Sequence, residues 1–220
     1  MLTCFLYLTK NINLSDQLTR KGKFKEKATL PNFFELYKKN VLIFGYGRIG
    51  KEVAKRCMGF EANIFVCDPL IENKVIEDHG CKPISKIEGI KLADYISIHL
   101  PLTKETKNFI SKKEFELMKE SVILVNSARG GIVSENDLFD ALIKNKIRGA
   151  GLDVFEQEPP DENHKLFKLP NILLSPHNAA LTLECRKRMA VEGAENIIKY
   201  LKNKDDLNLN NVVNKKEIGI

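Results

Sequence analysis

Several features that mark other classes of protein are missing from this 220-residue sequence. No stretch comes near the roughly 18 consecutive apolar residues that a membrane-spanning helix needs. Residues 2–8 form only a short apolar run, without the basic leader and small-residue cleavage site of a secretory signal. The five cysteines are odd in number and include no CxxC pair, so neither a disulfide framework nor a metal site is indicated. We therefore expect a soluble, cytoplasmic protein without a membrane partner.

The excess of basic residues, 35 Lys and Arg against 29 Asp and Glu, lies at the two ends of the chain. Residues 41–180 are close to neutral, and residues 1–40 carry most of the surplus. A nucleic-acid-binding surface concentrates its basic residues on a recognition element with motif or aromatic support, which the lysines of residues 21–27 lack. We expect a solvated loop there and no nucleic-acid partner.

From residue 41 onward, short apolar runs alternate with longer amphipathic segments, the pattern of βαβ units in a parallel sheet covered on both faces. The expected strands are 41–44, 63–66, 95–98, 122–125, 151–154 and 172–174. The expected helices are 49–58, 72–79, 112–119, 135–144 and 182–201, with residues 2–20 also able to form one. Two further segments are expected to be irregular, a connector at 22–32 and a loop or frayed terminus at 203–220. The predicted fold is α/β, a doubly wound parallel sheet with flanking inter-domain helices.

Gly45, Gly47 and Gly50 form a GxGxxG motif directly after the first expected strand and at the start of a helix. In this context the first glycine permits a tight turn, the second lets the backbone approach a pyrophosphate, and the third allows close helix-to-strand packing. The helix amino terminus offers free N–H groups to the anion. The motif predicts a Rossmann-type dinucleotide site, in preference to a glycine-rich turn without a ligand.

Asp68 lies at the end of the second expected strand, where a carboxylate accepts hydrogen bonds from an adenosine ribose. This residue favours NAD over NADP because its charge repels a 2′-phosphate. The three residues after it, 69–71, include no arginine that could bind such a phosphate. The alternative is a solvated surface aspartate.

Three side chains that can bind or move charge follow the ends of other expected strands: Arg129, Glu158 and His177. The carboxyl ends of parallel strands meet at one edge of a sheet, so we expect these residues to converge on a ligand. A guanidinium fork suits a carboxylate, a histidine can move a proton, and a glutamate can orient the histidine and raise its pKa. Singly, each residue has a simpler explanation, namely an interface salt bridge, a surface carboxylate and a core histidine.

Six sequence blocks follow one another in an order found in a known enzyme family. The blocks are Gly45-Tyr-Gly-Arg-Ile-Gly50, Cys67-Asp68-Pro69, His99-Leu-Pro-Leu-Thr103, Asn126-Ser-Ala-Arg-Gly-Gly131, Gly151-Leu-Asp-Val-Phe-Glu-Gln-Glu-Pro159 and Ser175-Pro-His-Asn-Ala-Ala180. On these blocks the chain resembles the D-isomer-specific 2-hydroxyacid dehydrogenases. Its Asp-Pro turn is most similar to that of D-3-phosphoglycerate dehydrogenase and its near relatives.

The resemblance implies reversible hydride transfer between NAD and a 2-hydroxy or 2-keto acid, with 3-phosphoglycerate and hydroxypyruvate as candidate substrates. Arg129, Glu158 and His177 match the family's catalytic residues, and His177 would move the proton of the substrate hydroxyl. Glu156 is set aside because the family's carboxylate directly precedes the proline. The expected cofactor-binding positions are Gly45, Gly47, Arg48, Ile49, Gly50, Asp68, Pro101, Thr103, Ser127, Ala128, Asp153, Asn178, Ala179 and Ala180. Among these, Asp153 would face the nicotinamide carboxamide.

The resemblance also implies a domain organisation. Residues 1–181 would form the NAD-binding domain, with an inter-domain helix and connector at 1–40 and the Rossmann core at 41–181. Residues 182–220 would be a closing helix and tail, a remnant of the substrate domain. About 100 residues that precede the first helix in similar family members have no counterpart in this sequence.

The implied partners are a small 2-hydroxy or 2-keto acid and a second copy of the chain, forming a homodimer through the NAD-binding domain. Two functions stay open at this point. One is an NAD-dependent dehydrogenase. The other is a non-catalytic NAD(H)-binding module, either a fragment or a chain that needs a separate partner carrying the substrate domain.

Overall fold

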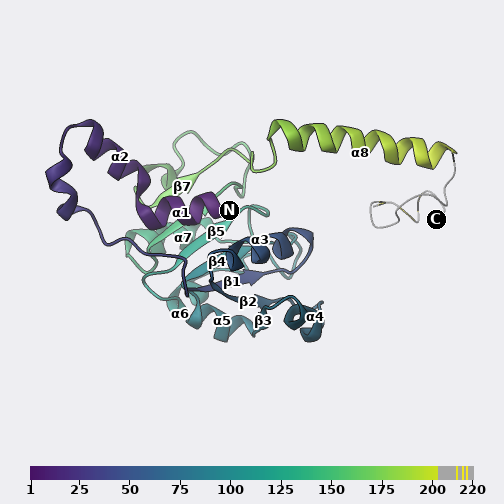
Figure 1. Ribbon diagram of the computed structural model, residues 1–220, viewed down its shortest axis with the longest axis horizontal. Coiled ribbons are helices and arrows are strands. Elements are labelled where there is room, and N and C mark those ends of the chain that lie inside the picture. Colours follow the sequence, from purple (N-terminus) through teal and green to yellow (C-terminus); the bar gives the residue numbers. More distant parts are fainter. Residues whose placement is uncertain (203–211, 213–214, 216, 218–220) are drawn as a thin grey trace. The chain divides into compact units, whose positions relative to one another are not determined.

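The computed structural model describes residues 1–202, 212, 215 and 217, and its central element is a seven-stranded sheet with all strands parallel (Figure 1). The strands lie in the order β3-β2-β1-β4-β5-β6-β7. They are β1 Asn40–Phe44, β2 Asn63–Cys67, β3 Lys82–Pro83, β4 Tyr95–Ile98, β5 Ile123–Asn126, β6 Gly149–Leu152 and β7 Ile172–Leu174. The predicted doubly wound α/β fold is confirmed.

The chain divides into two compact units, Met1–His177 and Asn178–Ile220. The first unit contains the whole sheet. In the second, the described residues form one long helix, α8 Leu183–Lys202. Within the described part of the chain, no helix has the length and apolar character needed to cross a bilayer. The loop predicted at 203–220 lies outside the described residues except for positions 212, 215 and 217.

Helices cover both faces of the sheet because successive side chains of each strand point to opposite sides. On one face, Val41 and Ile43 of β1 belong to a core that also contains Phe5. On the other face, Leu42 and Phe44 belong to a second core. The helices of the first unit are α1 Leu2–Lys10, α2 Ile12–Arg20, α3 Arg48–Met58, α4 Asn73–Asp78, α5 Lys86–Leu92, α6 Lys112–Leu117 and α7 Glu135–Ile143, with 3₁₀ turns η1 Phe24–Thr29 and η2 Lys165–Lys168. Burial on both faces explains the near-continuous apolar runs.

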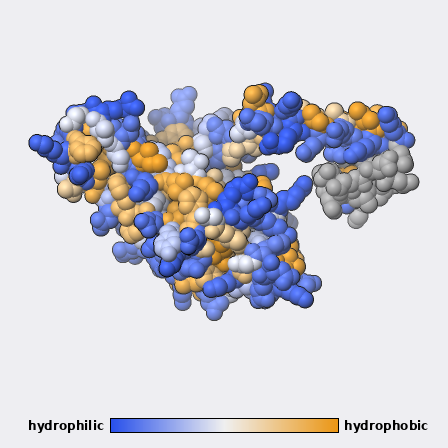
Figure 2. Space-filling view, viewed as in Figure 1, coloured by the Kyte–Doolittle hydropathy of each residue, from blue (hydrophilic) through white to orange (hydrophobic). Residues whose placement is uncertain are grey.

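Helix α1 packs against β5, β6 and β7 through Phe5 and Leu8, which are buried. The contact is close, since a Cβ added to Gly151 of β6 would lie 2.7 Å from the Cβ of Cys4. Leu2 and Leu6 are only half-buried. Figure 2 shows hydrophobic residues gathered over the middle of the first unit, where α1 crosses the sheet in Figure 1.

The helix expected over residues 2–20 is broken into α1 and α2 at Asn11. Asn11 has φ 47° and ψ 49°, a left-handed conformation that asparagine tolerates better than most residues. The connector expected at 22–32 contains the 3₁₀ turn η1. The single-helix expectation was wrong because no local signal distinguishes a kinked amphipathic segment from a straight one.

Two short elements were not predicted from the sequence, the strand β3 and the helix α5. The seventh strand, β3, has two residues, one of them Pro83, and pairs only with β2 at the sheet edge, where proline is tolerated. Helix α5 begins after Ser85, whose hydroxyl accepts the Glu88 N–H. The strand expected at 151–154 is Gly149–Leu152, two residues earlier at both ends, since these are the residues that pair with β5.

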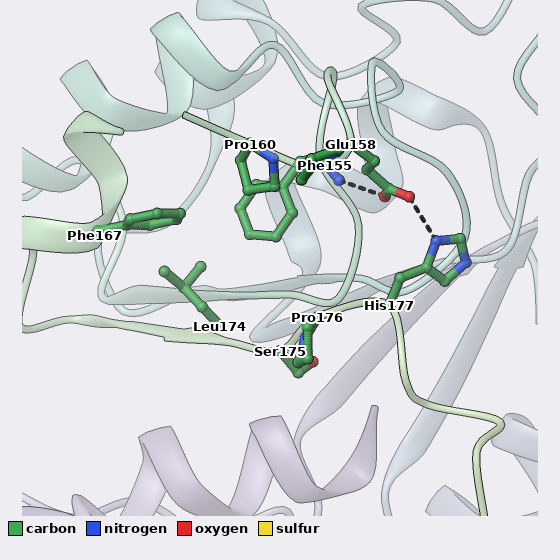
Figure 3. Close-up of a pocket in the computed structure, with 9 residues that line it drawn as sticks. Phe155, Glu158, Pro160, Phe167, Leu174, Ser175, Pro176 and His177 are labelled. Atoms are coloured by element: carbon green, nitrogen blue, oxygen red, sulfur yellow. Dashed lines mark hydrogen bonds and ion pairs between the residues drawn. The ribbon is translucent and has the colours of Figure 1, made fainter. Parts of the chain in front are cut away.

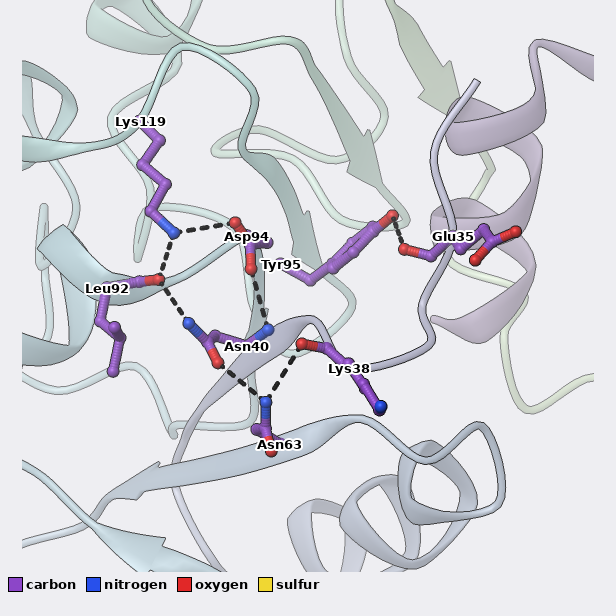
Figure 4. Close-up of polar contacts among 8 residues, drawn as sticks. All are labelled: Glu35, Lys38, Asn40, Asn63, Leu92, Asp94, Tyr95 and Lys119. Atoms are coloured by element: carbon purple, nitrogen blue, oxygen red, sulfur yellow. Dashed lines mark hydrogen bonds and ion pairs between the residues drawn. The ribbon is translucent and has the colours of Figure 1, made fainter. Parts of the chain in front are cut away.

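A network of hydrogen bonds fixes the amino-terminal ends of β1 and β4 (Figure 4). The Asp94 carboxylate accepts the Asn40 N–H at 2.9 Å and the Lys119 ammonium at 2.8 Å. Both partners also donate to the Leu92 carbonyl, Lys119 at 2.6 Å and the Asn40 side chain at 3.2 Å. This network holds β1 and β4 in register, and therefore aligns their carboxyl ends at the opposite edge.

Candidate functional site

The candidate residues of the first unit all lie at the carboxyl-terminal edge of the sheet or in the first turn of α3. Strand β1 leads into Gly45, β2 into Asp68, β5 into Ser127 and β6 into Asp153, and β7 is followed by His177. The strand order reverses between β1 and β4, and ligands of open α/β sheets bind in the crevice outside such a reversal. Asn178, Ala179 and Ala180 begin the second unit, and their contribution stays a prediction.

The three glycines of the turn after β1 meet different steric requirements. Gly45 has φ +89°, and a Cβ there would lie 2.5 Å from the His99 carbonyl oxygen. A Cβ on Gly50 would lie 2.1 Å from the Gly45 carbonyl oxygen. By contrast, a Cβ on Gly47 would meet no protein atom within 4 Å. Gly47 thus leaves accessible backbone just before α3, which fits the close approach of a pyrophosphate. The neighbouring Arg48 and Ile49 are exposed.

The Asp68 carboxylate is hydrogen-bonded to the same turn. Its Oδ2 accepts the Tyr46 N–H at 2.7 Å, and its Oδ1 accepts the Leu70 N–H at 2.9 Å. Each carboxylate oxygen has a second lone pair, so both can still accept ribose hydroxyls. Asp68 also lines a cavity of about 720 Å³. The carboxylate and the open glycine turn together fit the adenosine and pyrophosphate of a dinucleotide.

The turn after β4 forms part of the cavity wall. Leu100, Glu105 and Thr106 line the cavity, and sequence reasoning missed them. Thr103 donates its hydroxyl to Glu105 at 2.7 Å, and the Pro101 carbonyl accepts the Thr106 hydroxyl at 2.5 Å. Pro101 and Thr103 therefore shape the turn, and their contact with the cofactor stays a prediction.

His99, at the start of this turn, hydrogen-bonds the Ser97 hydroxyl through Nε2 at 2.8 Å. Burial lowers the pKa of His99 to about 4. The ring is therefore neutral near pH 7.

Asn126 holds the loop that contains Ser127, Ala128 and Arg129. Its side chain is buried, with Oδ1 accepting the Ala128 N–H at 3.0 Å and Nδ2 donating to the Arg129 carbonyl at 2.8 Å. The Arg129 guanidinium is exposed and donates to the Ala128 carbonyl at 2.6 Å. Asn126 was not predicted as a site residue, although its place at the end of β5 was a usable signal.

Gly130 brings this loop against the segment that follows β6. A Cβ on Gly130 would lie 1.7 Å from the Phe155 carbonyl oxygen, so the two backbones touch where only glycine fits. The Phe155 N–H donates to Glu158 Oε1 at 3.0 Å. The backbone next to Arg129 therefore lies against the segment that holds Glu158.

His177 and Glu158 form a hydrogen-bonded pair, with His177 Nδ1 2.8 Å from Glu158 Oε2 (Figure 3). The bond from His177 and the N–H of Phe155 hold the pKa of Glu158 below its usual range. His177 has φ +51°, a left-handed conformation that is uncommon for residues other than glycine. In Figure 3 the other ring nitrogen points away from Glu158.

An apolar pocket of about 460 Å³ lies beside this pair. Its lining residues other than the pair are Phe155, Pro159, Pro160, Phe167, Leu174, Ser175 and Pro176. Figure 3 shows Phe167 and Leu174 on the side of the pocket away from the His177 ring. The nearby Glu156 instead accepts the Glu135 N–H at 2.9 Å, at the start of α7.

Asp153, at the end of β6, is 5% exposed and accepts the Ser175 hydroxyl at 2.5 Å. Its N–H donates to the Asn126 carbonyl at 3.1 Å. Ser175 was present in the sequence motif but was not predicted as a site residue. A backbone hydrogen bond therefore joins the ends of β5 and β6, and a side-chain hydrogen bond joins the ends of β6 and β7, at the edge where the candidate residues lie.

Comparisons of the sequence and of the structure with known proteins agree with this architecture. Residues 2–179 match the profile of the D-isomer specific 2-hydroxyacid dehydrogenase, NAD binding domain. The chain is 39% identical to D-3-phosphoglycerate dehydrogenase of Archaeoglobus fulgidus over 90% of its own length and 37% of the relative's. It is 40% identical to glyoxylate reductase of Thermococcus litoralis over 94% of its own length and 63% of the relative's. The chain thus spans less than two thirds of either relative.

A solved structure of D-lactate dehydrogenase from Aquifex aeolicus, complexed with NAD and lactic acid, has a TM-score of 0.87 to this chain. The two are 29% identical, and the alignment covers 96% of this chain and 68% of that one. The predicted family and the predicted cofactor NAD are confirmed by the profile match. The chain belongs to the D-isomer-specific 2-hydroxyacid dehydrogenase family and carries its NAD-binding domain.

Proposed function

We propose that the protein catalyses reversible hydride transfer between NAD and a small 2-hydroxy or 2-keto acid, with His177 as the acid–base residue. The observation that carries the proposal is the 2.8 Å contact between His177 Nδ1 and Glu158 Oε2. A histidine oriented by a carboxylate, next to the end of a dinucleotide-binding sheet, is suited to moving one proton while hydride moves on the cofactor.

Glu158 holds the Nδ1 side of the ring, so Nε2 is the atom that would meet the substrate oxygen. In the oxidative direction Nε2 takes the proton of the substrate hydroxyl, and in the reductive direction it returns a proton to the carbonyl oxygen. Glu158 stabilises the imidazolium formed in the oxidative direction. When bound, NAD would supply the hydride acceptor of the oxidative direction, and its reduced form the hydride donor of the reductive direction. Such acid–base assistance contributes a rate factor of about 10² to 10⁴.

Arg129 would bind the substrate carboxylate, because its exposed guanidinium offers a planar fork of donors. Its loop touches the segment that holds Glu158 through the contact between Gly130 and Phe155. At the other end of the cofactor, Asp68 would accept the ribose hydroxyls. Ser127, Ala128 and Asp153 follow the ends of β5 and β6 and would surround the nicotinamide.

The substrate class follows from the relatives, which are named for 3-phosphoglycerate and glyoxylate. We propose 3-phosphoglycerate or hydroxypyruvate chemistry as the finer assignment. A homodimer through this domain and a cytoplasmic location complete the proposal. Light scattering at high concentration that detects only monomer would contradict the homodimer.

A second candidate function is NAD(H) binding without turnover. It is favoured by the exposure of the pair, since the side chains of His177 and Glu158 are 49% and 37% exposed. Efficient proton and hydride transfer requires a site from which water is excluded.

The deciding experiment follows NADH absorbance with phosphohydroxypyruvate, hydroxypyruvate, glyoxylate and pyruvate, with NADH affinity measured in parallel. Turnover that disappears in His177→Ala while NADH still binds supports the dehydrogenase. His79→Ala is the control, because His79 is an exposed histidine outside the proposed catalytic pair. Tight NADH binding without turnover on any substrate supports the binding module, and turnover that survives His177→Ala contradicts the acid–base assignment.

A further inference from the structure

The cavity beside Asp68 has an unusual balance of charge. Among its lining residues, Asp68, Glu88 and Glu105 are acidic, and Lys86 is the single basic residue. A cation in the wall of an adenosine cavity would ordinarily attract a phosphate on the ribose. What Lys86 can bind therefore depends on the contacts that it already makes.

Lys86 is held by partners within the protein. Its ammonium donates to Glu114 Oε1 at 2.8 Å and to the Phe109 carbonyl at 2.7 Å. The same nitrogen lies 3.9 Å from the centre of the Phe109 ring, in cation–π contact. The side chains of Lys86 and Glu114 are 29% and 12% exposed, so water and salt screen the pair less than a surface ion pair.

Glu114 is itself fixed by the start of α6. Its Oε2 accepts both the N–H of Ser111 at 2.9 Å and the Ser111 hydroxyl at 2.7 Å, which leaves Oε1 for Lys86. Burial opposes the charge, but the bonds from Lys86 and Ser111 outweigh it and hold the pKa of Glu114 below its usual range. Glu114 is therefore ionised at neutral pH and neutralises Lys86.

The charge of Lys86 also affects the pKa of Cys67, the last residue of β2. Burial and the charge of Asp68 raise the pKa of the Cys67 thiol, and Lys86 opposes that rise. Cys67 directly precedes Asp68 in the chain. Lys86 and Asp68 line the same cavity, so the ammonium faces the space in which the 2′ substituent of a ribose bound at Asp68 would lie.

We propose that Glu114 is a positioning residue that helps to select NAD over NADP by holding Lys86 in an internal ion pair. A 2′-phosphate next to Asp68 needs a cation to bind it. Glu114 prevents Lys86, the basic residue that lines the cavity, from binding this phosphate. Selectivity then depends on two residues far apart in sequence, the repelling Asp68 and the restraining Glu114. This inference rests on the proposed binding of the adenosine ribose at Asp68.

The test compares dissociation constants for NADH and NADPH, measured by fluorescence, in the full chain and its variants. Glu114→Gln keeps an oxygen for the helix cap but removes the charge that neutralises Lys86, and should improve NADPH affinity relative to NADH by about fivefold. Lys86→Met should instead make NADPH bind still more weakly, because Glu114 then adds an unpaired negative charge. The double variant Lys86→Met/Glu114→Gln should lose the gain of the single Glu114 variant.

Glu116→Gln is the matched control, since it removes the same charge from an exposed position of α6. If Glu114→Gln changes the affinity ratio no more than Glu116→Gln does, the inference is overturned. It is also overturned if the double variant keeps the gain, because the loss of a negative charge alone would then explain it. Asp68→Ala separates the two proposals, since unchanged NADH affinity in that variant would contradict the ribose site itself.

Discussion

The Ser175 hydroxyl lies 2.5 Å from the Asp153 carboxylate, so a residue two positions before His177 is hydrogen-bonded to the residue that directly follows β6. Asp153 is almost fully buried, and a buried carboxylate that loses a donor keeps its desolvation cost. Ser175→Ala should therefore lower the free energy of unfolding by about 1–3 kcal/mol and weaken NADH binding. Ser175→Thr keeps the hydroxyl and should restore both. Equal NADH affinity in the alanine and threonine variants would show that the hydrogen bond does not position Asp153 for the cofactor.

The hydrogen-bonded pair of Glu158 and His177 should make the free energy of unfolding depend on pH. Because folding lowers the pKa of Glu158, its contribution is present above the ordinary glutamate pKa and is lost as the pH falls through the lowered value. Glu158→Gln should lower the free energy of unfolding at pH 7 by less than about 1 kcal/mol, since the side chain is partly exposed, and the difference should shrink near pH 3. Urea denaturation at the two pH values measures this. Glu162→Gln, at an exposed position of the same loop, should show no such difference.

Substitution by alanine should mainly lower stability at one glycine and mainly weaken NADH binding at another. Gly130→Ala forces a Cβ to within 1.7 Å of the Phe155 carbonyl oxygen, and should lower the free energy of unfolding by about 3 kcal/mol or more. Gly47→Ala meets no protein atom and should change stability by less than about 0.5 kcal/mol, yet weaken NADH binding. Thermal unfolding and NADH titration of both variants test the contrast. A Gly47→Ala variant that binds NADH normally would show that the open backbone is not where the pyrophosphate lies.

The network at the amino-terminal ends of the strands should stabilise the fold more than a surface ion pair. Lys119→Met removes a donor shared by Asp94 and the Leu92 carbonyl, and should lower the free energy of unfolding by about 1 kcal/mol. Lys144→Met breaks a helical pair with Asp140 whose side chains are both 62% exposed, and should cost about 0.3 kcal/mol. Denaturant unfolding of the two variants at equal salt provides the comparison, and equal losses would contradict the structural importance of the network.

The parts of the candidate site that depend on residues close together along the chain could be predicted from the sequence. The glycine turn follows from the spacing of Gly45, Gly47 and Gly50 after an apolar run, and Asp68 follows from its place at the end of a strand. Asn126 and Ser175 were overlooked because their importance arises from bonds to other loops. Lys86 and Glu114 form a pair across 28 positions of sequence, and no periodicity relates them.

The fold also has some features that local sequence predicts and others that it does not. The short but continuous apolar runs of the central strands predicted the doubly wound sheet, since burial on both faces leaves a continuous pattern. The edge strand β3 has only Lys82 and Pro83, which is too short to produce any pattern. The break at Asn11 depends on a single backbone conformation, for which the residue type gives only a weak preference.

The packing of α1 has a consequence for the order in which the protein can fold. This helix spans residues 2–10 but packs on β5, β6 and β7, which lie between residues 123 and 174. During synthesis α1 therefore has no docking surface until most of the sheet has been made. Such contacts between distant segments slow folding and leave an apolar helix unprotected in the meantime. The apolar side chains of Phe5 and Leu8 therefore stay unpacked on the nascent chain until these strands have been made.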